Sequence, residues 1–212
     1  MQYILEILPS LFSGVVTTLE IFALTIVLSI PLGILVSLAL TGKNIIKAIF
    51  EFYVWIMRGT PLLLQLIFIF YGLPIIGIVF PRFEAAVIAF VLNYAAYFAE
   101  IFRGGFQSIP KNQFESAKML RLTRWQTLRK IVIPQVFKIV LPSIGNEVIN
   151  LVKDSSLVYV IGIGDLLQAG NIATARDVTL VPLILVAVFY LVLTAVLTLV
   201  LRKIEQRFDY WR

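Results

Sequence analysis

Polar and ionisable side chains recur at helical spacing inside apolar segments of this sequence. One set follows an i, i+4, i+7, i+11 pattern and comprises Ser143, Glu147, Asn150 and Asp154. A second set, at i, i+4 and i+7, comprises Asn93, Tyr97 and Glu100. Each spacing places its residues on one side of a helix. An ionisable group inside a bilayer costs about 2.5–3.5 kcal/mol, so each one needs a partner or a function. We expect the two stripes to line a polar path across a membrane.

Plainer interpretations of the same residues stay open. Glu100 precedes Arg103 by three positions and can simply be bridged to it on the helix surface. Asparagine and serine in membrane spans commonly form hydrogen bonds between helices. Arg58 begins the run RGTP, in which a proline just inside a helix start suits the first helical position. Arg58 therefore either helps to start and kink a helix or lies at one end of the path.

The residue types that the chain lacks limit its chemistry. It contains neither histidine nor cysteine, which excludes disulfides, thiol catalysis and histidine ligands to a metal. It also contains no G-x-x-x-x-G-K-S/T loop for binding phosphates. We therefore expect no catalytic residue, no metal site and no cofactor in this chain.

The composition is typical of a helical membrane protein. Of the 212 residues, 60% are hydrophobic and only 14% are charged, whereas a soluble domain carries about 25% charged residues. The long apolar runs predict an all-α, polytopic fold with five transmembrane helices, at residues 13–40, 60–80, 84–102, 131–152 and 180–201. We expect residues 45–57 to form an apolar segment at the membrane interface. We treat residues 1–212 as one transmembrane domain.

Lysine and arginine predict the orientation. All but Arg82, Lys153 and Arg176 of the 18 basic residues lie before the second span, in or beside the central loop, or in the C-terminal tail. Five spans put these three groups on one face, which the positive-inside rule assigns to the cytoplasm, with the N-terminus outside. The net charge of +6 is thus a topology signal and indicates no nucleic-acid partner. Between the last two spans, Gly162, Gly164 and Gly170 disfavour one long helix, so we expect short helical pieces in the outer leaflet.

The central loop, from about residue 104 to about residue 130, carries two signals for helix starts. Asn112 with Glu115, and Thr123 with Gln126, each fit a capping pattern, with a break near Arg121 and Leu122. Phe114, Ala117 and Leu120 share one face of the first helix. We call these two short helices the knob. The knob suits insertion into a groove on a cytoplasmic partner. Equally, it can be a connector whose basic residues meet the head groups of anionic membrane lipid.

The knob resembles the EAA loop of ABC importer permeases. That pattern is E-A-A, three residues, G, nine residues and I-x-L-P. This chain has Glu115, Ser116 and Ala117, then Arg121, then Ile131 to Pro134 with the same spacing. Arg121 stands where glycine is usual, and Ile133 where leucine is usual. If the turn needs a left-handed residue, arginine costs roughly 1–2 kcal/mol there.

Three further stretches are similar to the polar amino acid branch of these permeases. They are RGTPLLLQL (58–66), YFAEIFRGGFQSIPKNQFESA (97–117) and NLVKDSSL (150–157). Together the motifs cover nearly the whole chain. The resemblance implies a type I ABC importer permease of the bacterial inner membrane. It also implies a second permease subunit, identical or paralogous, and an external substrate-binding protein. A separate ATPase would bind ATP and magnesium and would receive residues 114–117, 120 and 121 of the knob.

The charges in the spans predict the substrate of such a permease. Carboxylates outnumber cations at mid-depth, and Glu147 has no cation within one helical turn. Because a buried carboxylate stays ionised more readily beside a cation, we expect a basic amino acid, with arginine or lysine first and histidine next. Asn150, Ser155 and Ser156 would meet its carboxylate and ammonium groups. The alternatives are glutamine or another neutral polar amino acid, an exporter, and an ion channel or membrane scaffold, although no filter-like repeat favours a channel.

Overall fold

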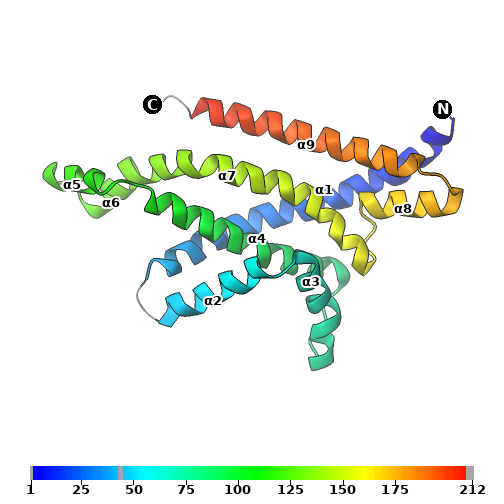
Figure 1. The fold of residues 1–212 in the computed structure, drawn as a ribbon, viewed down its shortest axis with the longest axis horizontal. Helices are drawn as coiled ribbons and strands as arrows, with labels where there is room; N and C mark the ends of the chain where they lie inside the picture. The colour runs from blue at the N-terminus through cyan, green and yellow to red at the C-terminus, as the bar shows by residue number, and fades with distance from the viewer. Residues whose placement is uncertain (1, 43–44, 209–212) are drawn as a thin grey trace.

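The computed structural model describes residues 2–42 and 45–208, and every regular element in this part of the chain is a helix. The long helices run side by side in an elongated bundle (Figure 1). These are α1 (Gln2–Leu40), α4 (Arg82–Gln107), α7 (Ile133–Asp154) and α9 (Val181–Arg207). The beginning of α1 and the end of α9 lie at opposite ends of the bundle, as an odd number of crossings requires.

The first, third, fourth and fifth predicted spans are confirmed as helices, and each helix is longer than predicted. Four helical stretches of the described residues are long and apolar enough to cross a membrane, namely Tyr3–Leu40, Arg82–Gln107, Arg124–Ile161 and Val181–Arg207. A bent pair of helices makes a fifth when it is counted as one span. The chain is therefore a multi-pass, all-helical membrane protein, as its composition indicates.

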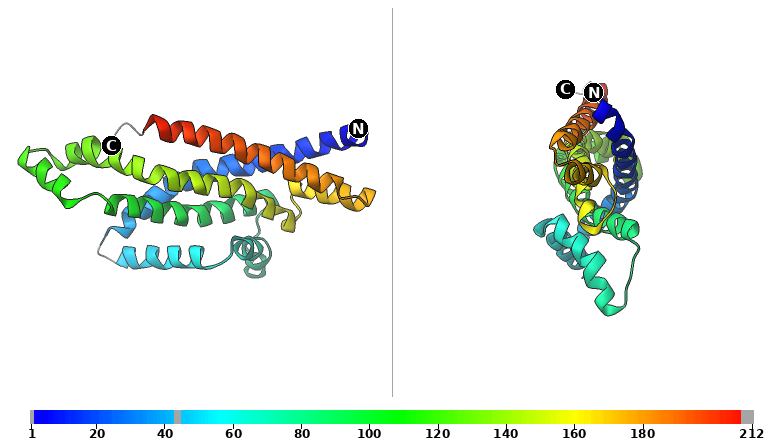
Figure 2. Two further views of the ribbon diagram at one scale, coloured as in Figure 1. Left: turned by 45° about the horizontal axis from the view of Figure 1, so that its top comes forward. Right: turned by 90° about the vertical axis from the view of Figure 1, so that its right-hand side faces the viewer.

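The second span differs from the straight helix expected over residues 60–80. Helix α2 (Ile45–Gly59) packs lengthwise against α1 and α4, so it is part of the bundle and not a separate interfacial segment. The chain then bends by 107° into α3 (Leu62–Ile67), η1 (Phe68–Gly72) and η2 (Leu73–Ile76), which project away from the bundle (Figure 2). The cause is Pro61, which has an extended backbone and disfavours helical geometry in the residue before it.

Close approach between backbones holds α1 against α4. The two helices pack along most of their length. A Cβ atom at Gly33 would lie 3.1 Å from the carbonyl oxygen of Ala95, so no larger residue fits without a shift. The facing side of α4 is rich in buried alanines, and α1 carries the buried small residues Thr25 and Ser29 on the same stripe as Gly33. Small residues take this role in membrane proteins because they let two helix backbones approach.

The structure contains two π-helical turns, η1 and η3 (Leu128–Val132), and a proline follows each of them closely. In η1 the N–H of Leu73 donates to the carbonyl of Phe68, and Pro74 follows. In η3 the N–H of Ile133 donates to the carbonyl of Leu128, and Pro134 follows. A proline ring clashes with the carbonyl four residues earlier, and the wider π-turn relieves that clash. The second turn joins the knob directly to α7.

Short helical pieces follow α7, as the glycines predicted. The 3₁₀ helix η4 (Ser155–Ile161) ends at Gly162, which is left-handed with φ of 75°. Helix α8 (Leu166–Asp177) begins at Asp165, whose carboxylate accepts hydrogen bonds from the backbone N–H groups of Leu167 and Gln168. Burial nevertheless raises the pKa of Asp165 to about 6. Gly170 lies within α8 and packs on Val186 of α9 instead of breaking the helix.

The knob consists of α5 (Lys111–Met119) and α6 (Arg124–Thr127) and lies at the far end of the bundle from α8 (Figure 1). The predicted cap at Thr123 is confirmed, since Thr123 and Gln126 each accept a hydrogen bond from the other's backbone N–H. The predicted cap at Asn112 is wrong. Helix α5 already starts at Lys111, and the carbonyl of extended Pro110 accepts the first hydrogen bond. Asn112 therefore lies inside the first turn.

The break after α5 is a Schellman turn with Arg121 in the left-handed position. Arg121 has φ of 54°, its N–H donates to the carbonyl of Lys118, and the N–H of Leu122 donates to the carbonyl of Ala117. Glycine is the usual residue at this position because it has no Cβ to clash there. The structure thus explains the glycine of the EAA pattern and shows that this chain bears the cost of replacing it.

We predict that Arg121→Gly stabilises the turn by about 1 kcal/mol, because the left-handed conformation no longer opposes a side chain. Hydrogen exchange at the amides of Arg121 and Leu122 should slow by roughly fivefold, the factor that corresponds to this free energy. The matched control is Leu120→Gly. Leu120 has a right-handed backbone with φ of −78°, so glycine there should speed exchange. Equal exchange rates in the Arg121→Gly variant and the parent would contradict this account.

Candidate functional site

A network of side-chain amides holds the broken second span against α4. The amide nitrogen of Gln65 donates to the carbonyl of Met57 at 3.0 Å, to the carbonyl of Thr60 at 3.2 Å and to its hydroxyl at 2.8 Å. The amide nitrogen of Asn93 donates to the carbonyl of Met57 and to the Gln65 side chain, both at 3.0 Å. Asn93, expected on the polar path, is buried inside this network. Gln65 was not among the predicted site residues, although it is a lone amide in the apolar run LLLQLI.

The second half of α4 meets the end of α2 in a cluster of charges. The guanidinium of Arg103 donates two hydrogen bonds to the carboxylate of Glu100, at 2.9 and 2.6 Å, which confirms the expected bridge. Arg58 lies 3.5 Å from the same carboxylate and places its guanidinium 5.4 Å from the centre of the Tyr97 ring. Three of the expected path residues, Arg58, Tyr97 and Glu100, are thus brought together.

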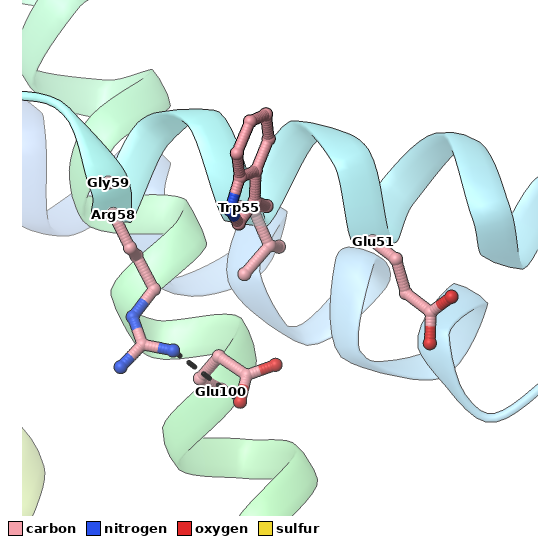
Figure 3. A pocket seen from close by; sticks show the side chains of 6 residues that line it. Glu51, Trp55, Arg58, Gly59 and Glu100 are labelled. Carbon is pink, nitrogen blue, oxygen red and sulfur yellow. Dashed lines mark ion pairs between the residues drawn. The ribbon is translucent and has the colours of Figure 1, made fainter.

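An open pocket of about 430 Å³ lies beside this cluster. Glu51, Val54, Trp55, Arg58 and Gly59 of α2 line it together with Glu100 of α4. Arg58 extends from the end of α2 toward Glu100, while Glu51 and Trp55 lie further back along the same helix (Figure 3). Because Arg103 already neutralises most of the charge of Glu100, the side chain of Arg58 keeps donors for another anion.

The stripe on α7 carries two carboxylates whose environment differs from that of Glu100. Glu147, Asn150 and Asp154 are all half-buried. Neither carboxylate forms an ion pair with any described residue of this chain. Glu147 is close enough to Asp154 and to Arg58 for both charges to act on it. Asp154 accepts a hydrogen bond at 2.7 Å from the hydroxyl of Tyr94 on α4, a partner that the sequence analysis did not identify.

The serines after the stripe use their hydroxyl groups locally. Ser155 is fully buried and donates to the carbonyl of Val152 at 2.7 Å. Ser156 donates to the carbonyl of Lys153 at the same distance. Each serine can still accept a hydrogen bond, but its proton is already used. Ser155 is therefore a weaker candidate for contacting a substrate than Glu147 and Asp154 are.

The knob presents apolar side chains to its surroundings. Of the face predicted from Phe114, Ala117 and Leu120, Phe114 and Leu120 are exposed, but Ala117 is only 1% exposed and packs within the chain. Glu115, Ser116 and Arg121 are exposed as well. Met119 and Trp125 add large exposed apolar side chains that the predicted face did not include. An apolar surface of this kind at the end of a bundle is typical of a protein contact.

Comparison with known proteins identifies the family. Residues 29–210 match the family model described as "Binding-protein-dependent transport system inner membrane component". The arginine transport system permease protein ArtQ of Bacillus subtilis is 37% identical over 203 residues, which are 94% of this chain and 93% of that protein. A putative glutamine transport system permease protein GlnP of Rickettsia bellii is 33% identical, covering 97% of both chains. The L-cystine permease protein TcyB of Bacillus subtilis is 36% identical, over 95% and 87%.

Solved structures agree with this assignment. A chain in the crystal structure of an amino acid ABC transporter with histidines has a TM-score of 0.91 and 34% identity, covering 97% of both chains. A chain of the MetNI methionine ABC transporter shares the fold, with a TM-score of 0.74, 21% identity and coverage of 94% and 96%. The chain therefore belongs to the family of binding-protein-dependent transport system inner membrane components, the permease subunits of ABC importers, in which ATP is hydrolysed on a separate subunit.

Proposed function

We propose that this permease imports a basic amino acid, with arginine or lysine as the preferred substrate. The observation that carries the proposal is the α7 stripe, in which Glu147 and Asp154 form no ion pair with described residues of the chain. Carboxylates in a membrane-spanning helix are costly unless a cation is near. A cationic substrate supplies that cation during passage.

The spacing of the two carboxylates fits a substrate with two cationic groups. Glu147 and Asp154 are seven residues apart, which is about 10.5 Å along a helix. A basic amino acid carries a side-chain cation at one end and an ammonium group at the other. The substrate's own carboxylate needs donors, and Arg58 offers them from the neighbouring pocket. Asn150 lies between the two carboxylates and supplies a neutral donor and acceptor.

Glutamine is the second candidate, because several relatives are putative glutamine permeases. The relative for arginine is somewhat more similar, at 37% identity against 33%. The unpaired carboxylates favour the basic substrate over the neutral one. A neutral side chain would add no counter-charge to Glu147, which forms no ion pair with any described residue.

The proposal includes an orientation and a set of partners. We place the knob and the end of α9 in the cytoplasm of a bacterial cell and the start of α1 outside the inner membrane, because the basic residues gather at the knob end. The exposed apolar residues of the knob then dock onto the ATPase. An external binding protein delivers the amino acid. A second permease subunit, identical or paralogous, completes the path between the two bundles.

We predict that Glu147→Gln raises the apparent KM for arginine by about tenfold in vesicles containing the assembled transporter, because a charge-assisted hydrogen bond is lost. Import should be measured with the binding protein and ATP present. The control is Glu20→Gln, which makes the same change on the exposed side of α1. If Glu147→Gln imports arginine at the parental rate and KM, Glu147 has a packing role and the substrate assignment is wrong.

A second prediction concerns coupling to the ATPase. Leu120→Arg should lower arginine import strongly while the variant still inserts in the membrane, because it places a charge in an apolar contact. Leu120 is 72% exposed, so the change does not disturb the packing of this chain, unlike a change at buried Ala117. Ser116→Ala on the same helix is the matched control and should remain active. Normal import and normal co-purification of the ATPase by Leu120→Arg would show that the knob is not the docking element.

A third prediction concerns orientation. A reporter that is active only in the cytoplasm should be active when fused to the end of the chain and inactive when fused before α1. The physical reason is the concentration of lysine and arginine at the knob end of the bundle. Both fusions should be compared by activity per inserted protein. The opposite pattern would place the knob on the side where no ATP is available and would overturn the proposed direction of coupling.

A further inference from the structure

Tyr94 lies at the middle of α4, outside every sequence motif described above. It is only 2% exposed. Its ring packs beside the rings of Tyr97 and Phe98, with centres 6.3 and 6.2 Å away. Its hydroxyl donates to an Oδ oxygen of Asp154 at 2.7 Å and so connects α4 to the last residue of α7. The packed ring leaves the hydroxyl little freedom to move.

The surroundings of Asp154 explain why such a donor is needed. Asp154 is the last residue of α7, but the helical chain continues directly into η4, so its half-buried carboxylate lies among packed helices and needs a hydrogen-bond donor there. The hydroxyls of Ser155 and Ser156 donate to backbone carbonyls and therefore do not donate to this carboxylate. Within the described ranges, Tyr94 is the residue whose hydroxyl donates to the carboxylate of Asp154.

A tyrosine differs from a basic residue in what it leaves available. An ionised carboxylate has two oxygens and about four positions that accept hydrogen bonds, and Tyr94 occupies one of them. The phenol is neutral, so it orients Asp154 without cancelling its charge. Glu100 shows the contrast on the same helix, because Arg103 donates two hydrogen bonds to it and neutralises it. Asp154 is thus held in place, and its remaining acceptor positions stay available.

We propose that Tyr94 is a positioning residue, whose hydroxyl holds Asp154 so that this carboxylate receives the α-ammonium group of the amino acid during passage. The proposal rests on the proposed function to the extent that Asp154 must line the path. It does not depend on the charge of the substrate side chain, since every α-amino acid carries the ammonium group. Selection for a basic side chain belongs to Glu147.

The test is a double-mutant cycle between Tyr94→Phe and Asp154→Asn in vesicles with the assembled transporter. The amino acid used is whichever of arginine, lysine and glutamine the parent imports best. Tyr94→Phe keeps the packed ring and should raise the apparent KM by roughly tenfold with little change in maximal rate. Because Tyr94 acts through Asp154, the double variant should have the same KM as Asp154→Asn alone.

The matched control is Tyr53→Phe. Tyr53 also donates a short hydrogen bond between helices, at 2.6 Å, but its acceptor is the backbone carbonyl of Leu92. Its loss should leave KM unchanged. If Tyr94→Phe behaves like Tyr53→Phe, or if its effect multiplies with that of Asp154→Asn, the positioning role is refuted while the proposed function stands. If Asp154→Asn itself keeps the parental KM, Asp154 is not on the path, and the positioning role of Tyr94 is refuted with it, while the role proposed for Glu147 is judged separately by Glu147→Gln.

Discussion

A membrane offers no water to polar groups, so each buried donor and acceptor must find its partner inside the protein. This constraint is most severe where the second span breaks at Pro61, because the end of α2 leaves carbonyl groups without helical partners. Two side-chain amides, Gln65 and Asn93, satisfy the carbonyls of Met57 and Thr60. The same hydrogen bonds attach the break to α4, and they thereby place Arg58 beside Glu100 and Tyr97. The cluster of Arg58, Tyr97 and Glu100 therefore lies where these hydrogen bonds attach the broken second span to α4.

The same constraint separates the charged groups into two classes. Glu100 is satisfied by two arginines and belongs to the framework of the bundle. Glu147 and Asp154 have no such partner among the described residues, and only the neutral hydroxyl of Tyr94 supports one of them. These two carboxylates lie on α7, which follows the knob through a single π-turn. If the knob docks on the ATPase as proposed, its movement is passed directly to the helix that carries the unpaired charges.

Features that depend on neighbours in sequence were predictable, and features that depend on distant ones were not. The spans follow from long apolar runs, the cap at Thr123 from its spacing to Gln126, and the bridge between Glu100 and Arg103 from three-residue separation. Asn112 fitted a cap as well as Thr123 did, but Pro110 starts the helix earlier. Tyr94 meets Asp154 across 60 residues, a pairing that no local spacing indicates. The sharp bend after α2 was also not predicted, because Pro61 indicates a break in the helix but does not specify its angle.

The most direct test of the account is an electron cryomicroscopy structure of the assembled transporter with arginine bound between the permease subunits. The account predicts the guanidinium within hydrogen-bonding distance of Glu147, the α-ammonium group at Asp154 with the hydroxyl of Tyr94 still bound to it, and the substrate carboxylate facing Arg58. A structure in which a basic residue of the second subunit pairs with Glu147, and arginine lies elsewhere, would contradict the central claim that the unpaired carboxylates of α7 receive the substrate.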